Sequence, residues 1–301
     1  MQSFVAVLIP ILIMFIPIVL GIVGLKLYFR FEQRKPVRRP FTQPFMRLPG
    51  QSLRDQIEAK REESDINIVM LMFMPVLMFA VHTAQSYFGE APETAFRIIS
   101  SIIIVIVTLI YFFRQIIKNK KELRAFELGL DGEIATAQLL DPLKRHGFHV
   151  YHDLQAKGFN IDHVLIGPNG VFAVETKARS KPDRGNNVAD SKVVFDGQHL
   201  VFPNHQESKS IEQAKRQAQW LSKWLSSAVG EIVPVSPLLV IPGWWVELKA
   251  KPVGINITNG TNLEFIARMN SGALLTEKQI KQITHQLEQK CVDDTKEGQS
   301  S

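Results

Sequence analysis

The sequence is organised around residues 161–177, which read IDHVLIGPNGVFAVETK. Two strongly apolar runs are separated here by Pro168 and Asn169, and a glycine stands on each side of this dipeptide. Apolar, β-branched and aromatic runs joined by two turn residues are typical of a β-hairpin with a tight loop. The stretch therefore predicts two antiparallel strands, over residues 160–167 and 170–178.

The length of the loop decides which side chains face each other across this hairpin. With a two-residue loop, Gly167 lies opposite Gly170, and Asp162 lies directly opposite Glu175. Paired residues share one face of the sheet with Cβ atoms about 4.5–5.5 Å apart, and two converging carboxylates suit a hard divalent cation. Lys177, two residues beyond Glu175, is expected to project from the same face.

Two alternatives stay open at this stage. A three-residue loop would pair Asp162 with Thr176 and place the two acids on opposite faces, and a bulge at Asn169 would also change the register. The tripeptide Glu-x-Lys is not specific, since it occurs at Glu58, Glu175, Glu207, Glu247 and Glu288. Only the copy at Glu175 ends an apolar strand. The alternative interpretation of Glu175 and Lys177 is a surface ion pair, which stabilises a folded protein by at most about 1 kcal/mol.

The rest of the second half predicts a mixed α/β domain over residues 126–290. Apolar residues at spacings of three and four indicate an amphipathic helix over residues 208–229. The other expected elements are a helix at 123–146, strands at 148–154, 193–195, 200–202, 235–241, 254–257 and 263–267, and a helix at 276–290. Two glycines in the string GLDGE (129–133) indicate a break in the first helix or a close backbone approach. Residues 291–301 are expected to form a disordered tail.

Four separate motifs resemble one family. They are GE at 132–133, YHDL at 151–154, the block at 161–177, and IEQ at 211–213. In this order they are similar to the NERD, or nuclease-related, domain, a branch of the PD-(D/E)xK restriction-endonuclease-like fold. The resemblance covers residues 129–224 and implies a mixed sheet flanked by helices that carries a nuclease site dependent on Mg²⁺ or Mn²⁺.

The resemblance also implies roles for individual residues. Asp162 and Glu175 would be carboxylate ligands of the metal, with the carbonyl oxygen of Thr176 as a third ligand. Lys177 would orient or deprotonate the attacking water and stabilise charge on the phosphate. Glu133, from the first helix, would assist the metal or a water beside it.

One further position matches the family with a departure. Gln213 corresponds to the glutamine of the later helix, but Ser210 and Ile211 stand where the family more often has Asn-Pro. This departure leaves the role of Gln213 open. His152 and His163 are interpreted as core histidines and not as metal ligands, because neither has a partner at ligand spacing. Trp220 and Trp224 are interpreted as helix packing and not as a base-stacking surface.

The first half, residues 1–125, predicts a membrane anchor. Residues 4–25 form an uncharged apolar run long enough to span a bilayer, and residues 66–88 and 95–113 are two further expected spans. A cleaved signal peptide is the alternative for the first run, but no basic residue precedes it. The basic linker 26–65 and the basic residues that follow position 113 place both segments, and the α/β domain, in the cytoplasm by the positive-inside rule. We therefore expect a multi-pass protein of the cell (inner) membrane.

Charge and cysteine content exclude other classes. Residues 1–125 carry 16 Lys and Arg against 9 Asp and Glu, whereas residues 126–301 carry 19 against 20, so the α/β domain has no basic excess. The single cysteine, Cys291, excludes an internal disulfide and a cysteine-based zinc site. The sequence thus predicts a membrane-anchored, Mg²⁺-dependent endonuclease that hydrolyses phosphodiester bonds on the cytoplasmic side, with DNA as the expected substrate and RNA as the alternative. The alternatives are a non-catalytic binding module on the same fold, and a membrane adaptor whose spans carry the function.

Overall fold

The structure, a computed structural model, describes residues 45–88, 94–182, 191–269 and 274–292, with scattered residues between 16 and 31. The chain divides into two compact units. One contains residues 59–123, and the other contains residues 45–58 together with everything described from position 124 onward. The expected span at 4–25 lies mostly outside the described residues, and the expected tail lies outside them beyond Val292.

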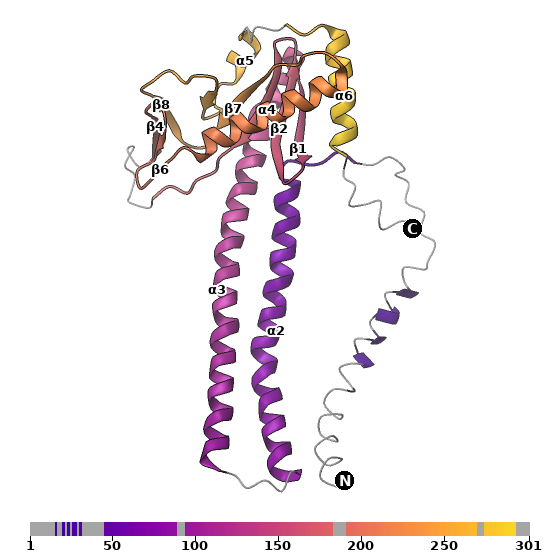
Figure 1. The fold of residues 1–301 in the computed structure, drawn as a ribbon, viewed down its shortest axis with the longest axis vertical. Coiled ribbons are helices and arrows are strands. Elements are labelled where there is room, and N and C mark those ends of the chain that lie inside the picture. The colour runs from indigo at the N-terminus through magenta and orange to yellow at the C-terminus, as the bar shows by residue number, and fades with distance from the viewer. Residues whose placement is uncertain are drawn as a thin grey trace. The chain divides into compact units, whose positions relative to one another are not determined.

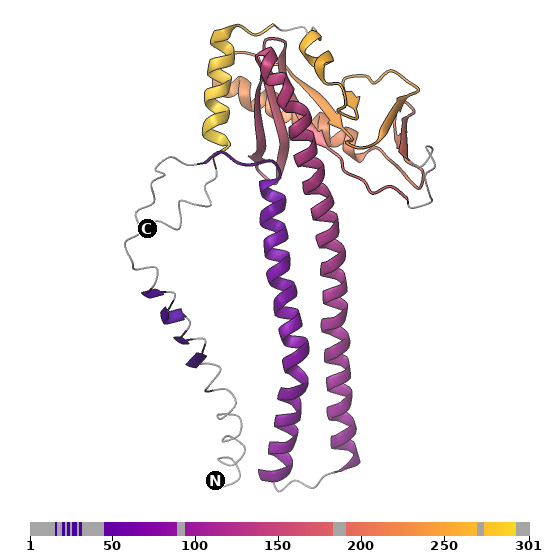
Figure 2. The same cartoon turned by 180° about the vertical axis from the view of Figure 1, so that it is seen from behind.

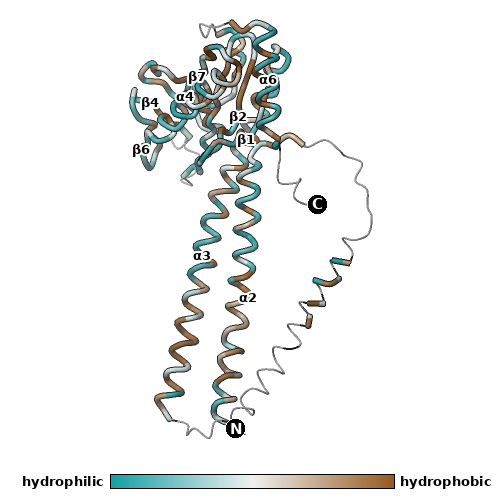
Figure 3. The backbone as a smooth tube through the Cα atoms, turned by 45° about the vertical axis from the view of Figure 1, so that its right-hand side comes forward, coloured by the Kyte–Doolittle hydropathy of each residue, from teal (hydrophilic) through white to brown (hydrophobic). Residues whose placement is uncertain are grey.

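The helical unit is formed by parts of two long helices, α2 (Gln51–Phe88) and α3 (Ala95–Leu140). Within this unit they run side by side and antiparallel (Figures 1 and 2). Their apolar residues gather in the C-terminal half of α2 and the N-terminal half of α3, as Figure 3 shows. Many of these side chains are exposed, including Ile103, Val107 and Ile110. Both helices are long and apolar enough to cross a membrane, so the described residues contain two candidate spans.

Polar contacts at the other end of this unit join the two helices. Lys60 Nζ lies 2.8 Å from Glu63 Oε2 on its own helix and 2.9 Å from Glu122 Oε2 on α3. These contacts belong to the charged part of the helices, where water can surround the side chains. The composition of the helical unit therefore changes from apolar to charged along its length (Figure 3).

The α/β unit is built on a mixed five-stranded sheet in the order β1-β2-β3-β7-β9. The first three strands are antiparallel to one another, and β7 and β9 continue the sheet in parallel. Their bounds are β1 His149–Ala156, β2 Phe159–Gly167, β3 Gly170–Thr176, β7 Val235–Val240 and β9 Asn256–Thr258. The expected mixed α/β fold with helices flanking the sheet is confirmed for this unit.

The hairpin between β2 and β3 has the two-residue loop. Gly167 pairs with Gly170, and the ladder continues to His163 opposite Val174. The next pair in this register is Asp162 and Glu175, so the alternative with a three-residue loop is wrong.

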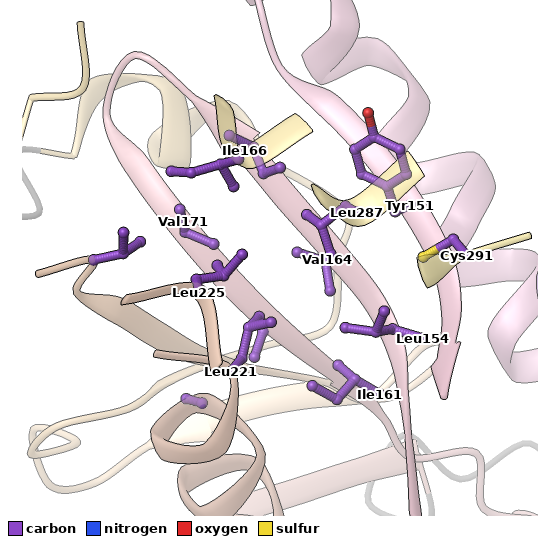
Figure 4. Packing of buried hydrophobic residues seen from close by; sticks show 14 residues of the cluster. Tyr151, Leu154, Ile161, Val164, Ile166, Val171, Leu221, Leu225, Leu287 and Cys291 are labelled. Carbon is purple, nitrogen blue, oxygen red and sulfur yellow. The ribbon is translucent and has the colours of Figure 1, made fainter. Parts of the chain in front are cut away.

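Helices cover both faces of the sheet. The face carrying Val164 and Val171 packs against α4 (Lys209–Val229) and α6 (Glu277–Lys290) through residues such as Leu225 and Leu287 (Figure 4). The opposite face packs against the end of α3, the 3₁₀ helix η1 (Asp141–His146) and α5 (Glu264–Arg268). Because β2 and β3 are buried on both faces, their apolar runs are nearly continuous.

A smaller four-stranded sheet lies in the order β6-β5-β4-β8. Its strands are β4 Lys192–Phe195, β5 Leu200–Val201, β6 Gln206–Glu207 and β8 Trp245–Leu248. The sequence analysis did not predict β6 or β8, and its strand at 263–267 is wrong. That segment forms α5, because Leu263 and Ile266, three residues apart, are the ones that become buried.

The helix α3 passes through GLDGE without a break, so the close-packing interpretation of these glycines is the right one. A Cβ atom at Gly132 would lie 2.6 Å from the Cβ of Ala178. A Cβ atom at Gly129 would meet only the flexible end of Leu53, at 3.2 Å. Gly132 is therefore required for the approach of α3 to the chain after β3.

We expect Gly132→Ala to lower the free energy of unfolding of the α/β unit by about 1–3 kcal/mol, because the added methyl group overpacks this contact. Chemical unfolding of the full chain in detergent micelles can be followed by tryptophan fluorescence, since all four tryptophans lie between positions 220 and 245. Gly129→Ala is the matched control and should unfold like the parent or be more stable. Equal destabilisation by both substitutions would contradict the contact with Ala178.

Candidate active site

The candidate site lies at the end of the β2–β3 hairpin remote from its turn. Asp162 in β2 and Glu175 in β3 are both buried, with 7% and 2% of their surface exposed. The backbone N–H of Thr176 donates to Asp162 Oδ2 over 2.7 Å. The hairpin therefore brings the two acids together on one sheet face, as its register requires.

Lys177 stands next to these acids. Its Nζ lies 3.9 Å from Glu175 Oε1. Its backbone N–H donates to the carbonyl of Val240 over 2.8 Å, which holds the chain in place beyond the end of β3. The ammonium group is partly exposed, so a ligand bound at the site can reach it.

Two glutamines of α4 contact the same acid. Gln217 Nε2 donates to Glu175 Oε2 over 2.7 Å and to the backbone carbonyl of Asn160 over 3.0 Å. Gln213, one turn earlier, also hydrogen-bonds to Glu175 and lowers its pKa. Gln217 is fully buried, whereas Gln213 is half-buried.

Glu133 approaches the acids from α3. Its carboxylate is 6% exposed, and its Oε2 has no hydrogen-bond partner. The pKa of Glu133 is raised to about 7, mainly by burial and in addition by the negative charges of Asp153 and Glu175, while a hydrogen bond from the backbone of Gly50 opposes the rise. A buried carboxylate oxygen without a hydrogen-bond partner destabilises the fold, so this atom is suited to bind water or a cation.

Burial dominates the electrostatics of the whole group. It raises the pKa of Glu175 to about 7 against the opposing effects of Lys177 and the two glutamines. It also raises the pKa of Asp162, and the charges of Glu175 and Glu133 add to this effect. Three buried acids thus share one nearby ammonium group, which is the kind of site that a divalent cation would stabilise.

The oxygen donors at this site suit Mg²⁺, which needs few ligands from the protein, better than a metal ion that needs a complete set of protein ligands. Among the residues that the structure describes, no group of three or more His, Cys, Asp or Glu side chains could hold a metal ion. Mg²⁺ is commonly held by one or two carboxylates and completes its coordination with water and substrate oxygens. Asp162 and Glu175 could supply these two carboxylates, the Thr176 carbonyl could add a third oxygen, and Glu133 could bind a water beside them.

The other sequence candidates lie elsewhere in the fold. The Nδ1 atoms of His152 and His163 are 2.9 Å apart, and burial lowers the pKa of both rings, so they form a neutral hydrogen-bonded pair. Trp220 and Trp224 of α4 are half-buried against the core, and their rings are parallel with centroids 6.0 Å apart. The packing interpretation of all four residues agrees with these contacts.

Residues 128–242 match the family model of the nuclease-related domain. The matched stretch includes Glu133, Asp162, Glu175, Lys177 and both glutamines, and it ends just after β7. No curated protein and no solved structure matches the chain significantly.

Three residues beside the site were not assigned to it from the sequence. Gln217 could have been found from its position one helical turn after Gln213. Asp153 lies within the YHDL motif, but it received no role there. Arg47 contacts Asp153 and lies outside the nuclease-related domain; no local pattern marks it, because its partner is 106 positions away.

The raised pKa of Glu175 predicts a pH effect on stability. Between its ordinary pKa and about 7, the folded state binds more protons than the unfolded state, so the free energy of unfolding decreases as pH rises. Without divalent cations, we expect this decrease between pH 5 and pH 8 to be smaller in Glu175→Gln than in the parent by about 2 kcal/mol.

The measurement is chemical unfolding of the full chain in micelles at several pH values, with Glu264→Gln, an exposed acid on α5, as the control. The control should follow the parent. Parallel pH profiles for the parent and Glu175→Gln would show that Glu175 is not held in its protonated form.

Proposed function

We propose that the chain is a membrane-anchored, metal-dependent nuclease that hydrolyses phosphodiester bonds, with DNA as its substrate. The observation that carries the proposal is the convergence of Asp162, Glu175 and Lys177 at one strand end inside a nuclease-related domain. RNA is the other substrate that the same chemistry would accept. Both substrates therefore enter the test.

Each side chain has a role in the proposed reaction. Mg²⁺ or Mn²⁺ held by Asp162 and Glu175 would supply a Lewis acid for the phosphoryl oxygen and an activated water. Lys177 orients the water and places a positive charge beside the phosphate. Gln217 fixes the rotamer of Glu175 through its 2.7 Å hydrogen bond. Glu133 Oε2, which has no partner, accepts a hydrogen bond from water at the site.

One observation favours a second candidate, a non-catalytic module that binds nucleic acid or protein near the membrane. The described residues contain no group of three or more His, Cys, Asp or Glu side chains that could hold a metal ion, and the pKa values of Glu133 and Glu175 are raised to about 7, so these acids can be protonated without a cation. Such a module would bind its partner without cleavage, and Lys177→Ala would leave that binding intact.

The test uses the full chain in micelles with supercoiled plasmid and with short single- and double-stranded DNA and RNA. Mg²⁺ or Mn²⁺ is added, and a chelator is used in parallel reactions. We expect metal-dependent cleavage of DNA that falls about 10²- to 10⁴-fold in Lys177→Ala and at least as far in Glu175→Ala.

Lys249→Ala is the matched control, because Glu247 and Lys249 repeat the same tripeptide at an exposed strand end. It should cleave like the parent. No cleavage of any substrate, together with no Mn²⁺ binding by calorimetry, would contradict the nuclease proposal and favour the binding module. Cleavage of RNA alone would change the substrate.

We further propose that the protein is multi-pass and that the nuclease-related domain is cytoplasmic. The support is the high hydropathy of α2 and α3 and the excess of Lys and Arg in the linker 26–65 and after position 113. In this topology, the connection between the two helices lies outside the cell.

Cysteine labelling tests this topology in a Cys291→Ser background. We expect Thr94→Cys, at the start of α3, to react with a membrane-impermeant maleimide in intact cells. Lys121→Cys, an exposed position on the charged part of α3, should react only after the cells are permeabilised. The reverse pattern would invert the topology, and labelling of both positions in intact cells would contradict membrane insertion.

A further inference from the structure

The strongest polar network outside the acid cluster centres on Asp153 of β1. This carboxylate is fully buried, and Arg47 is 9% exposed. Arg47 donates to Asp153 Oδ2 from Nε over 2.9 Å and from Nη2 over 2.6 Å. Ser52 donates to the same oxygen from its backbone N–H over 2.8 Å and from Oγ over 2.9 Å, and Asn160 Nδ2 donates to Oδ1 over 2.8 Å. Asp153 is therefore a buried carboxylate with a full set of hydrogen-bond donors.

The backbone is unusual at the same residue. Asp153 has φ of +50°, and it is the one residue other than glycine with a positive φ among those that the structure describes. The ladder between β1 and β2 pairs His152 with His163 and Leu154 with Ile161, so the intervening position faces Asp162. The negative charge of Asp153 thus lies next to the acid cluster, and it already contributes to the raised pKa of Glu133.

The segment that supplies Arg47 also touches the cluster directly. We call residues 45–53 the arm. At Gly50, with φ of +68°, an added Cβ atom would lie 3.7 Å from Glu133 Oε2 and closer still to a methyl group of Leu130. The arm backbone therefore lies against the carboxylate of Glu133, in a conformation that favours glycine.

The arm is attached to the α/β unit at its other end as well. Met46 forms a β-bridge with Val292, and the backbone N–H of Arg47 donates to the carbonyl of Cys291 over 2.8 Å. Ile57, which follows the arm in α2, is buried. These contacts hold the arm in one position between the end of α6 and the acid cluster, and residues 45–58 group with the α/β unit for this reason.

We propose that the arm is part of the metal site of the nuclease-related domain and that Arg47 is a positioning residue that acts through Asp153. Arg47 compensates the charge of Asp153, so that the cation at Asp162 and Glu175 is bound by a correctly placed set of acids. The inference rests on the proposed metal-dependent function. It goes beyond it because the family match begins at residue 128 and does not include the arm.

Loss of Arg47 has a definite physical consequence. Asp153 would keep its buried position without its cationic partner, beside two other acids, and the group would have to rearrange or take up a proton. Partners that orient metal ligands typically change metal affinity by about 10- to 100-fold when they are lost. A lysine at position 47 keeps the charge but cannot donate in the two-pronged manner of arginine.

The test measures Mn²⁺ affinity of the full chain in micelles by calorimetry, well below the unfolding temperature of each variant. We expect Arg47→Met to bind Mn²⁺ about 10- to 100-fold more weakly and Arg47→Lys to lie between it and the parent. The double variant Arg47→Met/Asp153→Asn, which removes both charges, should recover most of the parent affinity. Arg54→Met, an exposed arginine three residues into α2, is the matched control and should bind like the parent.

The outcomes separate this inference from the proposed function. If the parent binds no Mn²⁺, the proposed function fails and the inference fails with it. If the parent binds Mn²⁺ and Arg47→Met binds equally well, only the inference is overturned, because Arg47 then contributes stability alone. If Arg47→Met does not fold, the double variant decides: parent-like affinity supports the role through Asp153, and weak binding by a folded double variant overturns it.

Discussion

The two-residue turn at Pro168 and Asn169 is the constraint on which the site depends. It fixes the register of β2 against β3, and this register alone puts Asp162 opposite Glu175 on the face that α4 covers. One more residue in the turn would move one acid to the opposite face. The contact of Gln217 with Glu175 depends on the same register, because α4 can reach only one side of the sheet. A local feature of the backbone thus organises contacts between distant parts of the chain.

The unit buries acids in two different ways. Asp153 is surrounded by hydrogen-bond donors, including two N–H groups of Arg47. Glu133, Asp162 and Glu175 are equally buried but have few donors, and burial raises the pKa of each. The chain itself supplies the hydrogen-bond donors that Asp153 needs, whereas the other three acids need protons or a cation. This difference separates an acid with a structural role from acids with free coordination capacity.

Short-range patterns in the sequence predicted most of the fold. The hairpin, the amphipathic helix α4 and the last helix α6 each have a local period or turn signal, and the structure confirms them. The strand expected at 263–267 was wrong because so short an apolar segment fits either period. The arm could not be predicted, because Arg47 and Asp153 are complementary only across 106 positions. The role of Gln217 could not be predicted, because a glutamine in an amphipathic helix is usually exposed and its contact with β3 exists only in the folded unit.

The division of the chain has a consequence for membrane topology. Residues 45–58 and the chain from position 124 onward form one compact unit, and the segment between them is the helical unit. Both ends of that intervening segment must therefore be on the same side of any bilayer that it crosses. The number of crossings between Glu58 and Arg124 has to be even, whatever the distribution of basic residues. Two helices satisfy this parity, and a chain that inserted only one of them would separate Arg47 from Asp153 by the thickness of the membrane.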